Sequence, residues 1–135
     1  MTIKRFEDLD VWKNARELCK KIRTISDTTK LGKDYSIRDQ ILRSSGSCMD
    51  NIAEGFERDG NKEFINFLYI SKGSLGETRS QVHRSFDAGH FDKTIYDDLL
   101  NDCLNLLIDS VVRVGLDYFN FKCRVFHESH IRNRF

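Results

Sequence analysis

Apolar residues recur at steps of three and four along most of the chain, which is the spacing of one face of an α-helix. The pattern predicts four helices, over residues 5–27, 35–57, 61–86 and 93–118, the last extending further if its stripe is followed to residue 125. Short polar stretches that contain glycine end the first three helices. No segment alternates apolar and polar residues over more than a few positions, so we expect no β-strand.

Helices of similar length joined by short turns pack most economically as an antiparallel up-and-down bundle. The chain contains no proline, a residue that would break helix interiors, and this fits long uninterrupted helices. We therefore predict an all-α fold, in which residues 1–121 form a four-helix bundle and residues 122–135 form a basic tail.

Packing inside the predicted bundle is indicated by leucines in one helix and by small residues in two others. The fourth helix is expected to bury a stripe that begins at Leu100 and Leu104. The second and third helices carry small residues at 44–47 and at Gly73 and Gly76. A glycine inside a helix costs about 1 kcal/mol relative to alanine, so we interpret these positions as sites of close helix approach.

The composition is that of a globular cytoplasmic protein. Hydrophobic residues make up 39% of the chain and charged residues 32%, which is enough apolar surface to offset the entropy of folding. No apolar run is long enough for a secretion signal or a membrane span, and we expect no membrane partner. The four cysteines lie far apart, and we interpret them as reduced and buried rather than as disulfide or zinc ligands.

The predicted third helix carries a second stripe beside its core stripe. A monomeric bundle needs one buried face per helix, so a second non-random face indicates contact with a neighbouring subunit. Ile65 and Tyr69 in this stripe are interface candidates, as are Asn51 and Glu54 beside core positions of the second helix. The alternatives are a solvated flank for the stripe and hydrogen-bonded packing for Asn51 and Glu54. The whole stripe consists of Ile65, Tyr69, Lys72, Gly76, Arg79 and His83.

Basic side chains of this stripe and of the tail are candidates for contacts with phosphates. Neutralising cations and stacking aromatics are what single-stranded RNA binding requires. The net charge of +1 conceals +3 over residues 1–34 and +3 over 122–135, offset by −2 over 35–60 and −4 over 91–121, with +1 over 61–90. A near-neutral chain is not typical of a nucleic-acid-binding domain, and a merely soluble tail is the alternative. The candidates are Lys72, Arg79, His83, Arg84, Lys122 and Arg124.

Patterns typical of catalysis or cofactor binding do not occur in the sequence. There is no phosphate-binding loop, no serine-hydrolase elbow and no zinc-protease motif, and the serines at 44–47 have no base near them. His127 and His130 flank Glu128, but two histidines without a third fixed ligand make a weak metal site. We expect no enzyme activity, no cofactor, no metal and no small-molecule substrate.

Three blocks of the sequence resemble a known family, the bacterial four-helix bundle proteins often encoded within intervening sequences of 23S rRNA genes. The blocks are FEDLDVWKNARELC from Phe6, DNIAEGFER from Asp50 and KEFINFLYISKGSLGE from Lys62. The likeness covers about residues 5–118. The chain departs from the pattern at Met49-Asp50, where the family often has Pro before Ser, and at Gly76, where Ala is usual. The tail after Phe121 lies outside the likeness.

The resemblance implies an up-and-down four-helix bundle that assembles into a ring-shaped homo-oligomer, commonly a pentamer, with no enzymatic activity. It extends more distantly to the accessory proteins of diversity-generating retroelements, which form basic pentamers that bind nucleic acid and a reverse transcriptase. We therefore expect a non-catalytic oligomeric adaptor that binds RNA or a nucleoprotein. The alternative is a protein-protein scaffold with no nucleic-acid role, which displays the acidic segment 91–121.

Overall fold

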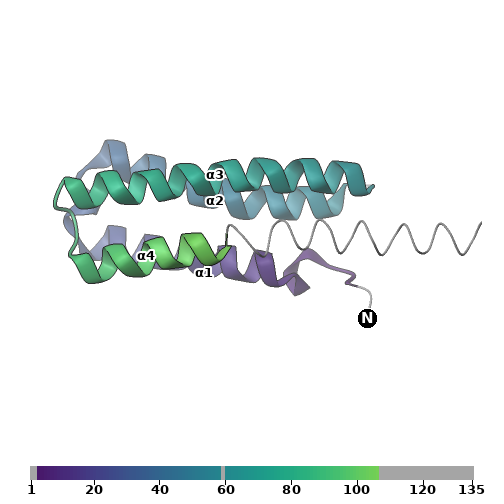
Figure 1. Ribbon diagram of the computed structural model, residues 1–135, viewed down its shortest axis with the longest axis horizontal. Coiled ribbons are helices and arrows are strands. Elements are labelled where there is room, and N and C mark those ends of the chain that lie inside the picture. The colour runs from purple at the N-terminus through teal and green to yellow at the C-terminus, as the bar shows by residue number, and fades with distance from the viewer. Residues whose placement is uncertain (1–2, 59, 107–135) are drawn as a thin grey trace, which may run out of the picture.

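The computed structural model describes residues 3–58 and 60–106, and these residues form helices joined by short turns with no strand among them (Figure 1). The later part of the fourth expected helix and the basic tail at 122–135 lie outside the described residues. The elements are η1 Phe6–Asp8, α1 Asp10–Thr28, η2 Lys30–Lys33, α2 Tyr35–Glu57, α3 Asn61–Asp87 and α4 Lys93–Asn105.

Local chemistry sets where these helices begin and end. The first α-helix starts at Asp10 rather than near residue 5, because Leu9 has an extended backbone that separates η1 from α1. Gly60 and Gly89 have φ values of 111° and 75°, in the left-handed region that favours glycine, and they stand at the two ends of α3. At the start of α4 the Asp92 side chain accepts a hydrogen bond from the backbone N–H of Ile95 at 3.0 Å.

The core of the bundle is built from the apolar stripes of the four helices. The stripes predicted for the first three helices are buried, with Ile22, Ile41 and Leu75 at 0% exposure. The stripe predicted for α4 is wrong by one position, because Leu99 and Cys103 are fully buried whereas Leu104 is 41% exposed. Pairs of adjacent leucines in this helix fit two neighbouring stripes, so spacing alone did not choose between them. The buried hydrophobic residues of α3 and α4 are Phe64, Leu68, Leu75, Val82, Leu99 and Cys103.

A seam of small polar residues joins α2 to α3, the pair of helices with the most extensive contact (Figure 1). Ser44 Oγ lies 2.8 Å from Thr78 Oγ1, and Ser71 Oγ donates to the Cys48 carbonyl oxygen at 2.7 Å. The numbers of the paired residues rise along α2 as they fall along α3, so these two helices run in opposite directions. We call these four residues, with Gly55, the seam.

The close approach expected at glycines occurs at Gly55 and not at Gly73 or Gly76. A Cβ atom on Gly55 would lie 2.5 Å from Phe67 Cβ, which is closer than real Cβ contacts allow. A Cβ atom on Gly73 or Gly76 would meet nothing within 4 Å. Among the described residues, the close approach predicted at these two positions does not occur, and Gly76 is half-buried whereas Gly73 is exposed.

Candidate functional site

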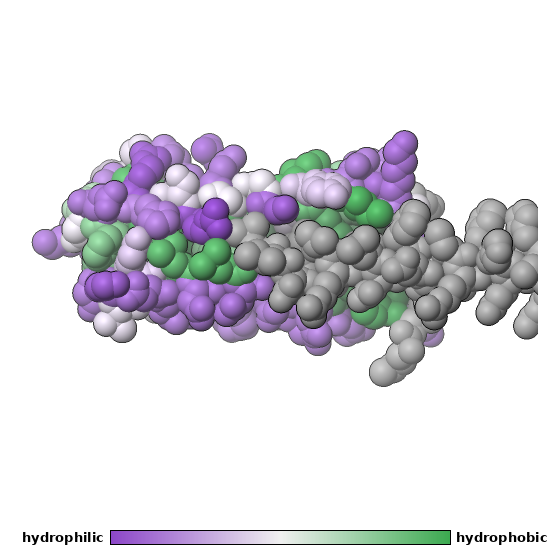
Figure 2. Space-filling view, viewed as in Figure 1, coloured by the Kyte–Doolittle hydropathy of each residue, from purple (hydrophilic) through white to green (hydrophobic). Residues whose placement is uncertain are grey.

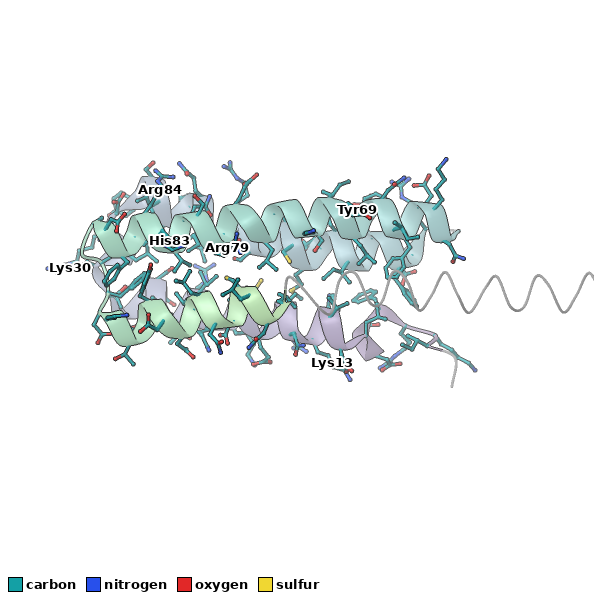
Figure 3. The ribbon with its side chains drawn as sticks, viewed as in Figure 1. Lys13, Lys30, Tyr69, Arg79, His83 and Arg84 are labelled. Carbon is teal, nitrogen blue, oxygen red and sulfur yellow. The ribbon has the colours of Figure 1, made fainter. Side chains whose placement is uncertain are left out.

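The second stripe of α3 runs along one flank of the helix, and its exposure varies along its length. Tyr69 is 64% exposed, and Lys72 and His83 are also exposed. Ile65 and Arg79 are half-buried. Figure 3 shows Tyr69 on the part of α3 that is far from the α3–α4 turn, and Arg79 and His83 on the part beside α4. The stripe therefore divides into a half beside α4 and a half beyond the described part of that helix.

The half of the stripe beside α4 is engaged by residues of the same chain. The Tyr96 hydroxyl lies 2.9 Å from His83 Nδ1, and the two rings contact each other edge to face at 5.5 Å between centroids. Tyr96 also stacks on Phe86, with centroids 4.2 Å apart. Arg79 is close enough to Cys103 to favour its thiolate, although burial dominates and raises the pKa of Cys103 to about 12. His83 thus joins α3 to α4, and it is also one of the candidate phosphate contacts.

The four predicted phosphate contacts on α3 do not form one cluster. Arg84 Nη1 donates to Gln40 Oε1 on α2 at 3.1 Å, whereas His83 bonds to Tyr96 on α4. Figure 3 accordingly shows Arg84 on the opposite side of α3 from His83 and Arg79. The remaining two candidates, Lys122 and Arg124, lie outside the described residues. The structure therefore brings Arg79 and His83 together and separates Arg84 from them.

The cations of α3 differ from the lysines of α1, each of which pairs with a carboxylate. Lys20 pairs with Glu17 at 3.3 Å, and Lys21 pairs with Asp98 at 2.8 Å and with Asp102. Within residues 3–58 and 60–106, no carboxylate lies within ion-pair distance of the α3 cations. Phosphates could approach them without displacing a protein anion. These α3 cations are Lys62, Lys72, Arg79 and Arg84.

An exposed face of α3 combines large apolar side chains with glycines, and we call it the outer face. Tyr69 is 64% exposed and Ile70 is 52% exposed. Gly73 and Gly76 follow within two helical turns and leave open space beside the backbone. Figure 2 shows apolar surface over the part of α3 where Figure 3 places Tyr69. The outer face consists of Tyr69, Ile70 and Gly73, with the half-buried Gly76 at its edge.

The two interface candidates on α2 have hydrogen-bond partners on their own helix. Asn51 Nδ2 donates to the Ser47 carbonyl oxygen at 2.7 Å and contacts Ser47 Oγ at 3.0 Å. Glu54 Oε1 accepts from Arg58 Nη2 at 2.9 Å. Both side chains thus have a local structural role, and their part in assembly stays a prediction.

The cysteines and other reactive groups are arranged as structural residues. Cys19, Cys48 and Cys103 are free thiols, and burial raises the pKa of each, that of Cys48 to about 11. Thiols of such high pKa stay protonated near neutral pH and are poor nucleophiles. Among residues 3–58 and 60–106, no three His, Cys, Asp or Glu side chains are grouped so that they could hold a metal ion. No helix in this part of the chain is long and apolar enough to cross a membrane.

Sequence reasoning missed a group of basic and aromatic residues at the junction of α1, η2 and α2. Arg38 lies over the ring of Tyr35, with 4.6 Å from the guanidinium carbon to the ring centroid, and Tyr35 is 65% exposed. Arg23 and Lys33 line a cavity with Arg38. The net charge of +3 over residues 1–34 was the available signal, but no motif tied it to a place in the fold.

The described fold defines an all-helical class of protein with four α-helices. The chain belongs to the family of 23S rRNA-intervening sequence proteins, whose pattern matches residues 7–108, and this confirms the resemblance of the three sequence blocks. The chain is also similar to a crystal structure of a protein with unknown function from the S23 ribosomal protein family of Bacteroides thetaiotaomicron. The two are 20% identical with a TM-score of 0.70, and the match covers 78% of this chain and 97% of that chain. At this identity the likeness shows the fold alone. No curated protein matches the chain.

Proposed function

We propose that this chain is a non-catalytic subunit of a ring-shaped homo-oligomer, with a pentamer favoured, that acts in the cytoplasm as an RNA-binding or nucleoprotein-binding adaptor. Each subunit is proposed to be an antiparallel up-and-down bundle. The observation that carries the RNA-binding role is the set of α3 cations with no carboxylate partner among the described residues. Cations without a carboxylate partner can neutralise the phosphates of RNA.

Assembly on the outer face supports the same function. Gly73 and Gly76 each weaken α3 by about 1 kcal/mol relative to alanine, and no contact among the described residues compensates for this cost. A helix of a second copy lying against these glycines, and covering Tyr69 and Ile70, would supply that compensation. A ring would also repeat the α3 cations at regular intervals. Several weak phosphate contacts on one strand of RNA then act together and raise the overall affinity.

The scaffold alternative relied on the acidity of residues 91–121. In the described part of that segment, Asp98 and Asp102 both pair with Lys21, and Asp97 pairs with Lys93 at 2.9 Å. These pairs neutralise much of the acidic surface that a basic protein partner would recognise. The paired carboxylates of α4 and the unpaired cations of α3 together favour the RNA-binding role over the scaffold.

The test is the salt dependence of RNA binding by the oligomer. We expect the affinity of the wild type for a single-stranded RNA to fall steeply between 50 and 200 mM salt, as it does for proteins that contact several phosphates. Lys72→Gln should weaken binding and reduce the slope of log K against log salt by about 0.7 for each phosphate that the variant no longer neutralises. Binding is measured by fluorescence anisotropy over a salt series.

The matched control is Lys13→Gln, which removes the same charge from α1, where Lys13 lies 4.0 Å from Asp10 (Figure 3). This variant should keep the slope of the wild type. Equal losses of affinity in both variants, or binding with no salt dependence, would count against phosphate recognition by α3. Recovery of a protein partner after nuclease treatment would favour the scaffold instead.

A further inference from the structure

A cavity of about 600 Å³ opens where the end of α1, the turn η2 and the start of α2 meet. Three cationic side chains line it, from Arg23 on α1, Lys33 on η2 and Arg38 on α2, together with the carboxylates Asp27 and Asp39. The negative end of α1 and the positive end of α2 both point to this junction, so their dipoles oppose each other. Side chains therefore decide what charge the cavity favours.

Ser26 is the one buried polar residue of this lining. It is only 2% exposed, and its Oγ has neither a hydrogen-bond partner nor contact with solvent. Its burial follows from the close packing of η2 on α1, since a Cβ on Gly32 would lie 2.1 Å from the Ser26 carbonyl oxygen. Buried hydroxyl groups nearly always have a partner, and an unmade hydrogen bond is costly. Ser26 thus adds to the cavity lining a buried hydroxyl that has no partner among the described residues.

The cations of the cavity remain available to an anion. Arg23 and Lys33 form no ion pair or hydrogen bond within the described part of the chain. Arg38 is held in place, because its Nε donates to Asp39 Oδ1 at 2.9 Å and its Nη1 donates to the Gly32 carbonyl oxygen at 3.2 Å. Its Nη2 also lies 2.8 Å from Asp39, so two of its five N–H donors are left over. Asp39 is thus neutralised by Arg38, whereas Arg23 and Lys33 exceed the remaining Asp27 in charge.

We propose that this cavity binds a phosphate group, which Arg23 and Lys33 neutralise and the fixed guanidinium of Arg38 orients. Ser26 belongs to the lining, and we propose that its side chain changes rotamer on binding so that Oγ donates to a phosphate oxygen. The phosphate belongs either to a small molecule, such as a nucleotide, or to the end of an RNA strand. The exposed ring of Tyr35 on Arg38 offers a stacking surface beside the phosphate. This site lies apart from the α3 surface and does not depend on the RNA-binding role proposed above.

The first experiment measures the rise in melting temperature of the full chain as inorganic phosphate is added, with equal ionic strength kept by chloride. A ligand that binds only the folded state raises its stability in proportion to the logarithm of ligand concentration above Kd. We expect a saturable rise for the wild type, and at least tenfold weaker phosphate binding for the double variant Arg23→Gln, Lys33→Gln. The control Lys13→Gln, Lys20→Gln removes the same charge from exposed positions of α1 and should match the wild type. A response that is absent, or equally weakened by the control, overturns the proposal.

Ser26→Ala separates a ligand contact from a structural role. This variant removes the unpaired hydroxyl, so without phosphate it should melt at or above the temperature of the wild type. Its affinity for phosphate should nevertheless fall several-fold. A lower melting temperature without phosphate, or an unchanged affinity, would show that the hydroxyl serves the fold and that the assignment of Ser26 is wrong.

The source of the phosphate is distinguished by three ligands measured in the same assay. Inorganic phosphate, a nucleoside monophosphate and a pair of short RNA strands, with and without a 5′-phosphate, are compared on the wild type and on Arg23→Gln, Lys33→Gln. Tighter binding of the monophosphate than of the strands assigns a small molecule. A preference for the phosphorylated strand that the double variant loses assigns an RNA end. The absence of binding by all three ligands rejects the site.

Discussion

The two sides of α3 differ in how far the described residues explain their composition. On the side that faces α2, contacts inside the chain explain the seam: Thr78 and Ser71 have partners on α2, and Gly55 of α2 makes room for Phe67 of α3. On the outer face, Tyr69 is 64% exposed and the glycines leave open space, so nothing among the described residues accounts for the composition. Positions that the fold of one chain explains are structural. Positions that the described residues leave unexplained are candidates for contacts outside those residues, and we propose a second copy as the partner.

The largest expected effect comes from placing a negative charge on either side. Leu75 is fully buried, so Leu75→Glu leaves an unpaired charge in the core and should cost more than about 4 kcal/mol, enough to unfold the chain. Tyr69→Glu places the same charge on the outer face and should leave the subunit folded while it dissociates the oligomer. Circular dichroism measures the fold and light scattering measures the mass.

Two results would contradict the proposed difference between the buried side and the outer face of α3. Unfolding of Tyr69→Glu would mean that the outer face belongs to the core of a subunit. Light scattering that shows a monomeric wild type would remove the ring. The control Tyr35→Glu changes a tyrosine of equal exposure, 65%, on α2, and it should keep both the fold and the mass of the wild type.

Glycine replacements on α2 test the tight side of the comparison with a smaller effect. Gly55→Ala forces a Cβ to within 2.5 Å of Phe67 Cβ, and overpacking of this kind costs about 1–3 kcal/mol. Gly46→Ala on the same helix meets nothing within 4 Å and should instead gain about 0.5–1 kcal/mol. Denaturant midpoints of the two variants give both values. Shifts of the same sign would contradict the close packing of α2 on α3 at Gly55.

The sequence was sufficient for the fold where one periodic signal dominated. Helix α2 spans Tyr35–Glu57, and its buried residues include Ile41 and Cys48 of the predicted stripe. It was insufficient on α4, where adjacent leucines such as Leu99 and Leu100 fit two stripes and only packing against the other helices selects Leu99. Periodicity gives the kind of element. Which residues of a helix face the core depends on the helices that pack against it.

The candidate site was less predictable, because the spacing of charged residues along the sequence does not determine which side chains lie close together in the fold. The steps along α3 placed His83 on one stripe and Arg84 beside it, but α4 engages the former and α2 the latter. The cavity at Ser26 could not be found from the sequence, since it depends on the contact of Gly32 with the end of α1. Unpaired groups become visible only when all possible partners are in place.

The smallest expected effect is the most direct test of the outer face. Gly73→Ala meets nothing within 4 Å among the described residues, so in dilute solution, where subunits are separate, it should stabilise the fold by about 0.5–1 kcal/mol. In the oligomer the added methyl group lies where we propose that a second copy packs, and it should weaken association about tenfold, equivalent to 1.4 kcal/mol. Sedimentation velocity over a dilution series measures association, and thermal unfolding at the lowest concentration measures the fold. Gly46→Ala is the control: we place it outside the interface, so it should gain helix stability without a change in association. Association that is unchanged in Gly73→Ala would mean that the open space beside this glycine faces solvent, and that subunits meet elsewhere.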